Sequence, residues 1–459
     1  MARLGYQHHR SDARVTASPH VMSKEADTIM RAMSQDPFVT QQELAHMCQV
    51  TAKQYQVAVN EVRLSDWAQQ QILYNGTGTK YWTNTIMPLL ESGTLQAAVD
   101  RRWMYPNRVG LYTGISCMFY CGFCGRNPVA QYGRDEAKTG FDFFRQIIDQ
   151  DPRTDAMWQD RFRISGGLEP LTNPYLGDII TYGAQQGYRM QLYTNGNMMT
   201  ARYLQQHPGM LDLEAVRFSL YGTTADKAYA VTRNRHSFDN IISNIVGYLN
   251  AATDTKVGIN WIVLPGHADD VLQLIDIVRN INLRAQRPID FVTLREDFSQ
   301  NIRTLGAGER QRLMEIFPLI DQFRESWDTH WDFGYALEPL RRGLDVGNLR
   351  MIDWQDMVPE SFAQVSVAVD VRGDAYVYHE SGFLDRPGAD RYIIGNIRDS
   401  SVEQVTQAWV NQGRTVRPMP MDVGFLDAFD HVVSTLINQA RSDAEFGIPW
   451  SKGPVRIRK

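Results

Sequence analysis

Three of the four cysteines in this 459-residue chain lie within eight residues, with the spacing Cys117-x₃-Cys121-x₂-Cys124. A structural zinc site needs four ligands, and the remaining Cys48 lies far upstream. Disulfides would pair an even set of cysteines and would suit a secreted chain. Three clustered thiolates can instead hold three irons of a 4Fe–4S cluster and leave the fourth iron open to a chelating ligand. We therefore predict a cluster here, the alternative being three core cysteines that are close by chance.

The elements that must position this motif begin at Arg108, where short apolar runs start to alternate with longer helical patterns. That alternation predicts strand–helix units and a parallel sheet. Six strands are expected, at residues 108–113, 161–165, 189–194, 215–220, 256–264 and 289–294. Helices are expected between and after them, at residues 141–149, 176–186, 238–251, 268–280 and 308–320. Six units close only part of a barrel, so the predicted fold class is α/β, a partial (β/α)6 barrel.

Glycine and polar residues follow each predicted strand, at the ends where barrels of this kind carry their chemistry. The motifs are the cysteines, Ser165 to Pro170 (SGGLEP), Thr194 to Gly196 (TNG), Ser219 to Gly222 (SLYG), Val263 to Gly266 (VLPG) and Arg295 to Asp297 (RED). Glycine lets a backbone approach a ligand closely. One such loop is ordinary turn chemistry, but six at one rim behind the thiols predict a binding site.

The predicted barrel spans residues 106–330. The segments before and after it do not show the same alternation of strand and helix patterns. Residues 1–105 are expected to form an N-terminal helical region. Residues 331–459 are expected to form a C-terminal α+β accessory domain, with a hairpin at residues 365–380, a strand at 392–397 and a helix at 401–411. No cysteine follows Cys124, so a single cluster is expected.

Within the N-terminal region, the run from Gln41 to Val62 also has the rhythm of a helix-turn-helix and begins with a capping-box pattern. A cluster-bearing DNA-binding regulator is therefore an alternative to an enzyme. Phosphate contacts dominate the affinity of such motifs, and Lys53 and Arg63 are the only lysine or arginine residues in and beside this run. The pattern favours a packed helical cap.

The composition, with 43% hydrophobic and 22% charged residues, is that of an ordinary globular protein. A formal net charge of −5 argues against attraction to nucleic acid or to an anionic membrane. The sequence contains no apolar run long enough to cross a bilayer and no apolar stretch typical of a secretion signal near Met1. Together with reduced cysteines, these features predict a cytoplasmic location.

The cysteine spacing, with Phe123 before the last cysteine, resembles the signature of the radical S-adenosylmethionine (SAM) superfamily. Within that superfamily the chain resembles the deaminases of nucleotide-linked 4-amino-4,6-dideoxy sugars, and it shares the cysteine spacing with the diol dehydratases of aminoglycoside pathways. The motifs that carry the closer resemblance are Tyr81-Trp82, Asn84-Thr85, Val109 to Tyr112, Ser165 to Pro174, Ser219 to Gly222, Val263 to Gly266, Arg295 to Asp297, Gly334 to Leu337 and Glu380 to Phe383.

The resemblance implies a 4Fe–4S cluster on Cys117, Cys121 and Cys124, with SAM as the ligand of the open iron. Glu169, after the turn formed by Gly166 and Gly167, is expected to hold the amino group of SAM. The remaining expected contacts are Asn195 and Ser219 to the ribose or the carboxylate, Leu264 and Pro265 to the adenine, and Arg126 to the carboxylate charge.

The predicted activity is hydrogen abstraction from a carbinol carbon of an amino or deoxy sugar, followed by elimination of ammonia or water. Such a carbon–nitrogen or carbon–oxygen lyase belongs to deoxysugar or antibiotic biosynthesis. Elimination needs a base and an acid, and the candidates are Glu296, Glu380, His379 and Tyr221. A nucleotide diphosphate would need guanidinium groups, for which the candidates are Arg295, Arg341 and Arg350.

Two alternatives keep the radical chemistry. One is a dehydratase of an aminoglycoside-like or cyclitol substrate, and the other is a dehydrogenase, because oxidation of the substrate radical gives a ketone. Either enzyme needs an electron donor such as flavodoxin or ferredoxin. A homodimer is an open option, and neither nucleic acid nor membrane is an expected partner.

Overall fold

The computed structural model describes residues 23–35, 46–51, 54–55, 57–58, 61, 89, 92–126, 129–152, 161–296, 305–334, 337–341 and 362–413. Most of the Gln41–Val62 segment lies outside these residues, as do Tyr81, Trp82 and Arg350. Two N-terminal helices belong to the described part, α1 (Lys24–Gln35) and α6 (Thr94–Val99). None of the helices in the described part of the chain is long and apolar enough to span a bilayer.

Strands and helices alternate from Arg108 to Phe333, and the strands pair in parallel in chain order. The strands are β1 (Arg108–Tyr112), β2 (Phe162–Ile164), β3 (Gln191–Thr194), β4 (Ala215–Leu220), β5 (Lys256–Val263), β6 (Phe291–Glu296) and β7 (His330–Phe333). The helices are α7 (Arg134–Gln150), α8 (Leu176–Gln185), α9 (Ala201–Gln206), α10 (Ala225–Thr232), α11 (Ser237–Ala251), α12 (Asp270–Arg284) and α13 (Ala307–Ser326). The predicted α/β fold is confirmed.

Two features differ from the six-unit expectation. Strand β7 adds a seventh parallel strand, paired with β6. Strand β8 (Ser366–Asp370) does not stand apart in an accessory sheet, because it pairs in parallel with β1. The hairpin of β8 and β9 (Asp374–Tyr376) is confirmed as antiparallel, and β10 (Ile393–Asn396) follows it.

The ten strands of the described residues therefore form one sheet in the order β10-β9-β8-β1-β2-β3-β4-β5-β6-β7. Helix α14 (Leu337–Arg341) follows β7, and α15 (Val402–Asn411) follows β10. In the described residues the sheet has two free edges, at β10 and β7, which fits a barrel that does not close. The division of the chain at residues 105 and 330 stays a prediction.

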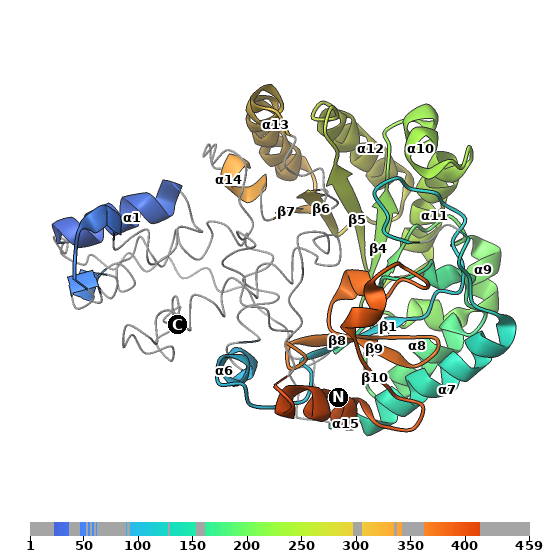
Figure 1. Ribbon diagram of the computed structural model, residues 1–459. Helices are drawn as coiled ribbons and strands as arrows, with labels where there is room; N and C mark the ends of the chain where they lie inside the picture. Colours follow the sequence, from blue (N-terminus) through green and yellow to red (C-terminus); the bar gives the residue numbers. More distant parts are fainter. Residues whose placement is uncertain are drawn as a thin grey trace, which may run out of the picture.

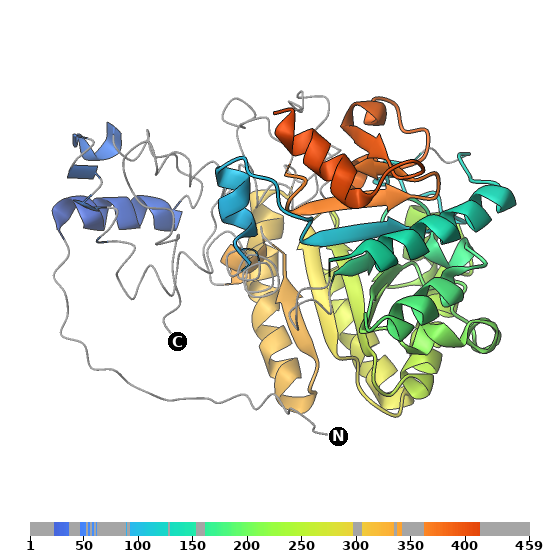
Figure 2. The same cartoon turned by 90° about the horizontal axis from the view of Figure 1, so that it is seen from below.

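Helices α7 to α13 follow one another along one side of the sheet (Figures 1 and 2). We call that side the outer face, and the opposite side the inner face. Phe218 on β4 packs against Tyr248 of α11, and Phe333 on β7 packs against Phe317 of α13, so both side chains face outward. Side chains alternate along a strand, so the residues next to Phe218 and Phe333 face inward.

Candidate functional site

The three clustered cysteines lie in the loop that leaves the carboxyl end of β1. All three are free thiols of intermediate exposure. Burial is the main reason why the pKa of Cys117 is raised to about 11 and that of Cys121 to about 12, with smaller contributions from Glu169 to the first and from Cys124 and Cys117 to the second. The Cys124 amide donates to the Cys121 carbonyl at 3.1 Å, so the last two cysteines share one turn of this loop, and ligation of a cluster by the three thiols stays a prediction.

Three cysteines in one loop match the number of protein ligands of a 4Fe–4S cluster with an open iron. In the described part of the chain, no three His, Cys, Asp or Glu side chains are grouped to hold one metal ion. The thiolates of a 4Fe–4S cluster each bind a different iron, so they surround the cluster instead of meeting at a point. Binding of cationic irons also supplies the charge that buried thiolates need.

The side chain of Arg126 packs against the backbone of the cysteine loop. Its guanidinium donates to the carbonyl oxygen of Phe119 and, at 3.4 Å, to that of Cys117, and it stacks 5.2 Å from the ring centroid of Tyr120. The residue is 8% exposed. The structure gives Arg126 a role in shaping the loop around the thiols, and its expected contact with the SAM carboxylate stays a prediction.

The glycine turn after β2 packs directly against the end of β1. Gly166 and Gly167 have φ values of +79° and +64°, which side chains rarely adopt. A Cβ atom on Gly166 would lie 2.3 Å from the ring of Tyr112, and one on Gly382 would lie equally close. The ring of Tyr112 therefore holds this turn against a C-terminal segment, and its hydroxyl donates to the carbonyl of His379.

Glu169 joins the loops that follow β2 and β3. Its carboxylate accepts hydrogen bonds from the Leu171 amide at 3.2 Å, the Asn195 amide at 2.8 Å and the Thr194 hydroxyl. Burial raises the pKa of Glu169, and these three hydrogen bonds partly offset that effect by stabilising the charged form. A carboxylate has about four acceptor positions, so the described contacts leave room for the amino group that we predict it binds.

Asn195 links this carboxylate to the cysteine loop. Its side-chain amide lies 3.9 Å from Sγ of Cys117 and 3.2 Å from Sδ of Met118. The backbone amide of Glu169 donates to the carbonyl of Ser116 at 2.8 Å, which joins the loops a second time. These contacts thus bring Cys117, the glycine turn, Glu169 and Asn195 into one group of neighbouring residues.

Tyr221 follows β4 and packs under the same loop. Its ring lies 5.4 Å from that of Phe123 and 6.4 Å from that of Phe119, measured between centroids. Burial raises the pKa of Tyr221 well above its ordinary value, and a contact with Ser219 offsets only part of that rise. The phenol therefore keeps its proton at neutral pH. Leu264 and Pro265 follow β5, where the Leu264 carbonyl accepts from the amide of His267 at 3.1 Å.

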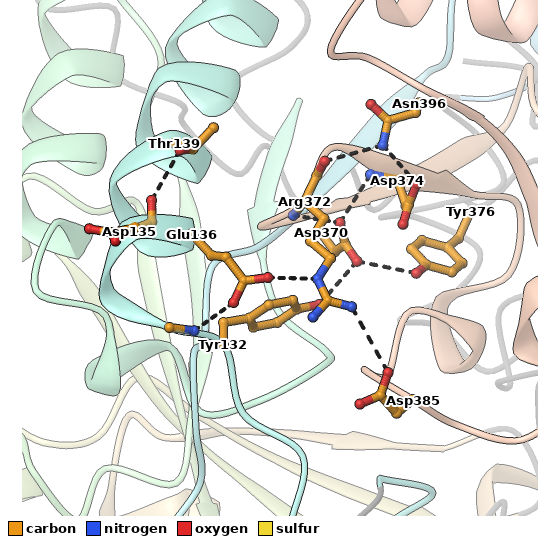
Figure 3. A network of polar contacts seen from close by, with 11 residues as sticks. Tyr132, Asp135, Glu136, Thr139, Asp370, Arg372, Asp374, Tyr376, Asp385 and Asn396 are labelled. Carbon is orange, nitrogen blue, oxygen red and sulfur yellow. Dashed lines mark hydrogen bonds and ion pairs between the residues drawn. The ribbon is translucent and has the colours of Figure 1, made fainter.

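A buried carboxylate fastens the far end of the cysteine loop to the β8–β9 turn (Figure 3). Asp370 accepts from the hydroxyl of Tyr132 at 3.0 Å and from the backbone amides of Arg372 and Asp374 at 2.9 and 3.0 Å. The Tyr132 amide in turn donates to the carbonyl of Ile115, just before the first cysteine. Burial raises the pKa of Asp370 to about 6. The C-terminal strands therefore brace the loop that carries the thiols.

Of the other expected site residues, some lie away from the cysteine loop, and the side chains of others are not among those that the structure describes. The imidazole of His379 contacts the Ser366 hydroxyl at 2.9 Å, beside the amino-terminal end of β1. Arg341 pairs with Asp321 at 3.0 Å and stacks on the outward-facing ring of Phe333. Arg350 and the side chains of Glu296 and Glu380 lie outside the described residues. Their proposed roles stay predictions.

Four residues that support these loops were given no role by the sequence analysis. They are Tyr112, Thr172, Thr194 and Asp370. The Thr172 hydroxyl accepts from the backbone amides of Ile115 and Ser116, each at 3.1 Å. The first three lie inside motifs that the sequence analysis quoted, but their contacts depend on how the loops pack, and Asp370 had no such signal.

One curated relative is similar to most of the chain. It is the dTDP-4-amino-4,6-dideoxy-D-glucose ammonia-lyase of Streptomyces venezuelae, 38% identical over 392 residues, which are 83% of this chain and 80% of the relative. No protein-family model matches the sequence.

Solved structures show more distant similarity. Streptococcus suis SuiB bound to the precursor peptide SuiA is 14% identical, with a TM-score of 0.45 over 66% of this chain and 65% of that chain. Native anSMEcpe with bound AdoMet is 12% identical, with a TM-score of 0.46 over 68% of this chain and 83% of that chain.

A sheet of parallel strand–helix units with three grouped cysteines after its first strand defines a radical SAM enzyme, whose cofactors are a 4Fe–4S cluster and SAM. Within that superfamily, the chain belongs to the family of the dTDP-4-amino-4,6-dideoxy-D-glucose ammonia-lyase.

Proposed function

We propose that this enzyme eliminates ammonia from a nucleotide-linked 4-amino-4,6-dideoxy sugar. The observation that carries the proposal is the 38% identity to an ammonia-lyase of that name over 83% of the chain. Loss of ammonia from neighbouring alcohol and amine carbons gives a ketone and is redox-neutral overall. The elimination therefore needs no external electron acceptor.

We assign cluster ligation to Cys117, Cys121 and Cys124. The cluster and SAM, when bound, supply one-electron chemistry that removes a hydrogen atom from the carbinol carbon of the sugar. The group formed by the glycine turn, Glu169 and Asn195 adjoins Cys117, and it is our candidate for the amino-acid part of SAM. Further candidates for SAM contacts are Ser219, Leu264 and Pro265.

The elimination needs a base for the hydroxyl proton and an acid for the departing amine. Tyr221 is not suited to be the base, because its raised pKa keeps the proton on the phenol, and it is our candidate for a hydrogen-bond donor to the leaving nitrogen. The carboxylates of Glu296 and Glu380 remain our candidates for the base. His379 is a weaker candidate, because its imidazole is engaged with Ser366.

Arg295 is our leading candidate for the diphosphate. It lies on β6, two residues after Thr293, and Ile262 pairs with it in register. Because of that register, the Arg295 side chain faces inward and lies level with Tyr221 along the strand direction. Arg341 is less suited, because its ion pair with Asp321 and its stacking on Phe333 place it on the outer face.

A one-electron donor is required as a partner, and we propose a flavodoxin or ferredoxin. All four cysteines are described as free thiols, which fits a reducing compartment such as the cytoplasm.

Product analysis tests the proposed function. Reconstituted, reduced enzyme with SAM and dTDP-4-amino-4,6-dideoxy-D-glucose is expected to release ammonia, measured by an ammonia assay, and to form a dTDP-linked ketosugar that has lost the 4-amino nitrogen, measured by mass spectrometry. A ketone that keeps its amine would identify a dehydrogenase. If this sugar is left intact, and an aminoglycoside or cyclitol diol loses water, the enzyme is a dehydratase instead.

A further inference from the structure

The inner face of the sheet carries a row of polar side chains on four neighbouring strands. Ser219 of β4 pairs in register with Asn260 of β5, Asn260 pairs with Thr293 of β6, and Thr293 pairs with Asp332 of β7. Ser219 follows the outward-facing Phe218, and Asp332 precedes the outward-facing Phe333. Register partners in a parallel sheet point to the same side, so all four side chains face inward.

Two of these four side chains are buried, and one of the two has an unsatisfied hydroxyl. Asn260 is 7% exposed and Thr293 is 1% exposed. The hydroxyl of Thr293 has no hydrogen-bond partner in the part of the chain that the structure describes. A buried hydroxyl without a partner costs free energy and is rare in proteins, so its position calls for a ligand or a bound water.

A layer of stacked side chains lies beside the row, toward the amino-terminal ends of the strands. Arg217, two residues before Ser219 on β4, lies 5.0 Å from the ring centroid of Tyr193 and 4.8 Å from that of Phe291. Gly258 makes room for this packing, since a Cβ atom there would meet the Phe291 ring at 2.1 Å. Toward the amino-terminal ends of the strands, this aromatic and guanidinium layer covers the inner face of β3, β4 and β6.

On its other side the row opens toward the cysteine loop. Tyr221 stands two residues beyond Ser219, contacts Ser219, and packs against Phe123 between the second and third cysteines. Arg295 stands two residues beyond Thr293. A molecule resting on the row would thus lie between the layer of Arg217 and the site that we assign to the cluster and SAM.

We propose that Asn260, Thr293 and Asp332 of this row bind the amino-sugar ring of the substrate, next to the SAM contact assigned to Ser219. Asp332 supplies the carboxylate for the protonated amine, and the side chains of Thr293 and Asn260 bind ring hydroxyls. His330, which contacts Asp332 at 2.8 Å, orients that carboxylate. This assignment rests on the proposed function, because it takes the ligand to be an amino sugar.

Binding to unreduced holoenzyme, carrying cluster and SAM but unable to turn over, tests the row. The probes are dTDP-4-amino-4,6-dideoxy-D-glucose and its analogue with a hydroxyl in place of the amine, titrated by calorimetry. Asp332→Asn is expected to weaken binding of the amino sugar by roughly 10- to 150-fold, the range for a hydrogen bond to a charged group, and to change the analogue far less. Asp328→Asn, at an exposed position before β7, is the matched control and is expected to bind both like wild type.

Thr293 gives an independent test with a conservative rescue. Thr293→Val keeps the shape of the side chain but removes the hydroxyl, and it is expected to weaken both sugars by roughly 2- to 10-fold. Thr293→Ser restores the hydroxyl and is expected to restore most of the affinity. SAM affinity and the cluster spectrum should stay unchanged in both, which separates sugar binding from damage to the fold.

Failure of the row and failure of the proposed function give different results. Wild-type affinity for the amino sugar in both Asp332→Asn and Thr293→Val would overturn the row and leave the ammonia-lyase proposal intact. If wild-type holoenzyme binds neither sugar, the proposed function fails and the row loses its ligand. Should Asp332→Asn fail to fold, Asn260→Ala serves in its place, and a loss of less than about twofold in amino-sugar affinity would count against the row.

Discussion

Replacing Cys117, Cys121 or Cys124 by alanine is expected to abolish the 4Fe–4S cluster and all reductive cleavage of SAM. Each thiolate holds a different iron, so the loss of one leaves two irons of the cluster without a protein ligand when the open iron is counted. The neighbouring thiols cannot substitute, because each occupies its own place in the loop braced by Arg126 and Tyr132. Absorbance of the reconstituted protein near the usual iron–sulfur band, with iron and sulfide analysis, measures the loss.

Cys48→Ala is the matched control for these variants. Cys48 is a free thiol far from the cysteine loop in sequence. Its replacement is expected to leave iron content and SAM cleavage at wild-type levels. A complete 4Fe–4S spectrum in any of the three loop variants would refute the ligand assignment.

Replacing Glu169 by alanine is expected to weaken SAM binding by at least about 10-fold and to lower the unfolding temperature. The side chain is 6% exposed, and its removal leaves the amides of Leu171 and Asn195 and the hydroxyl of Thr194 without their acceptor. Each buried donor left unsatisfied costs about 1–3 kcal/mol. Because Asn195 also contacts Met118 beside the first cysteine, the disturbance reaches the cluster loop.

Two readouts separate the structural from the ligand-binding role of Glu169. Glu169→Gln keeps one acceptor oxygen and similar volume, so it is expected to retain more stability than the alanine variant but still lose SAM affinity, since the charge is gone. Glu403→Ala, at an exposed position on α15, controls for general effects of removing a glutamate. An unchanged dissociation constant for SAM in Glu169→Gln, together with reduced stability in Glu169→Ala, would mean that Glu169 stabilises the two loops and does not bind SAM.

Much of the fold could be predicted because its signals are local. The strand of residues 215–220 and the helix of residues 237–251 follow apolar patterns that one segment displays by itself. Strand β7 was missed because its four residues include His330 and Asp332, whose polarity hides a short strand. The pairing of β8 with β1 joins segments more than 250 residues apart, and no local pattern specifies such a partner.

The candidate site was likewise predictable only where its residues lie in local sequence motifs. The thiols, the glycine turn and Glu169 lie in motifs with distinctive spacing, and the structure brings them together with Asn195. The row that includes Asn260 and Thr293 was missed, because it depends on the register between strands. Arg126 was expected to meet SAM because of its charge, whereas its contacts with the carbonyls of Cys117 and Phe119 depend on how the loop folds.

Isotope transfer is the most direct test of the central claim, that cluster-bound SAM acts on an amino sugar held below the cysteine loop. The substrate is dTDP-4-amino-4,6-dideoxy-D-glucose with deuterium on the carbinol carbon next to the amine-bearing carbon. Reduced wild-type enzyme is expected to yield 5′-deoxyadenosine that carries one deuterium, together with released ammonia, as measured by mass spectrometry. Formation of 5′-deoxyadenosine without deuterium, and with no ammonia above the no-enzyme control, would contradict the account.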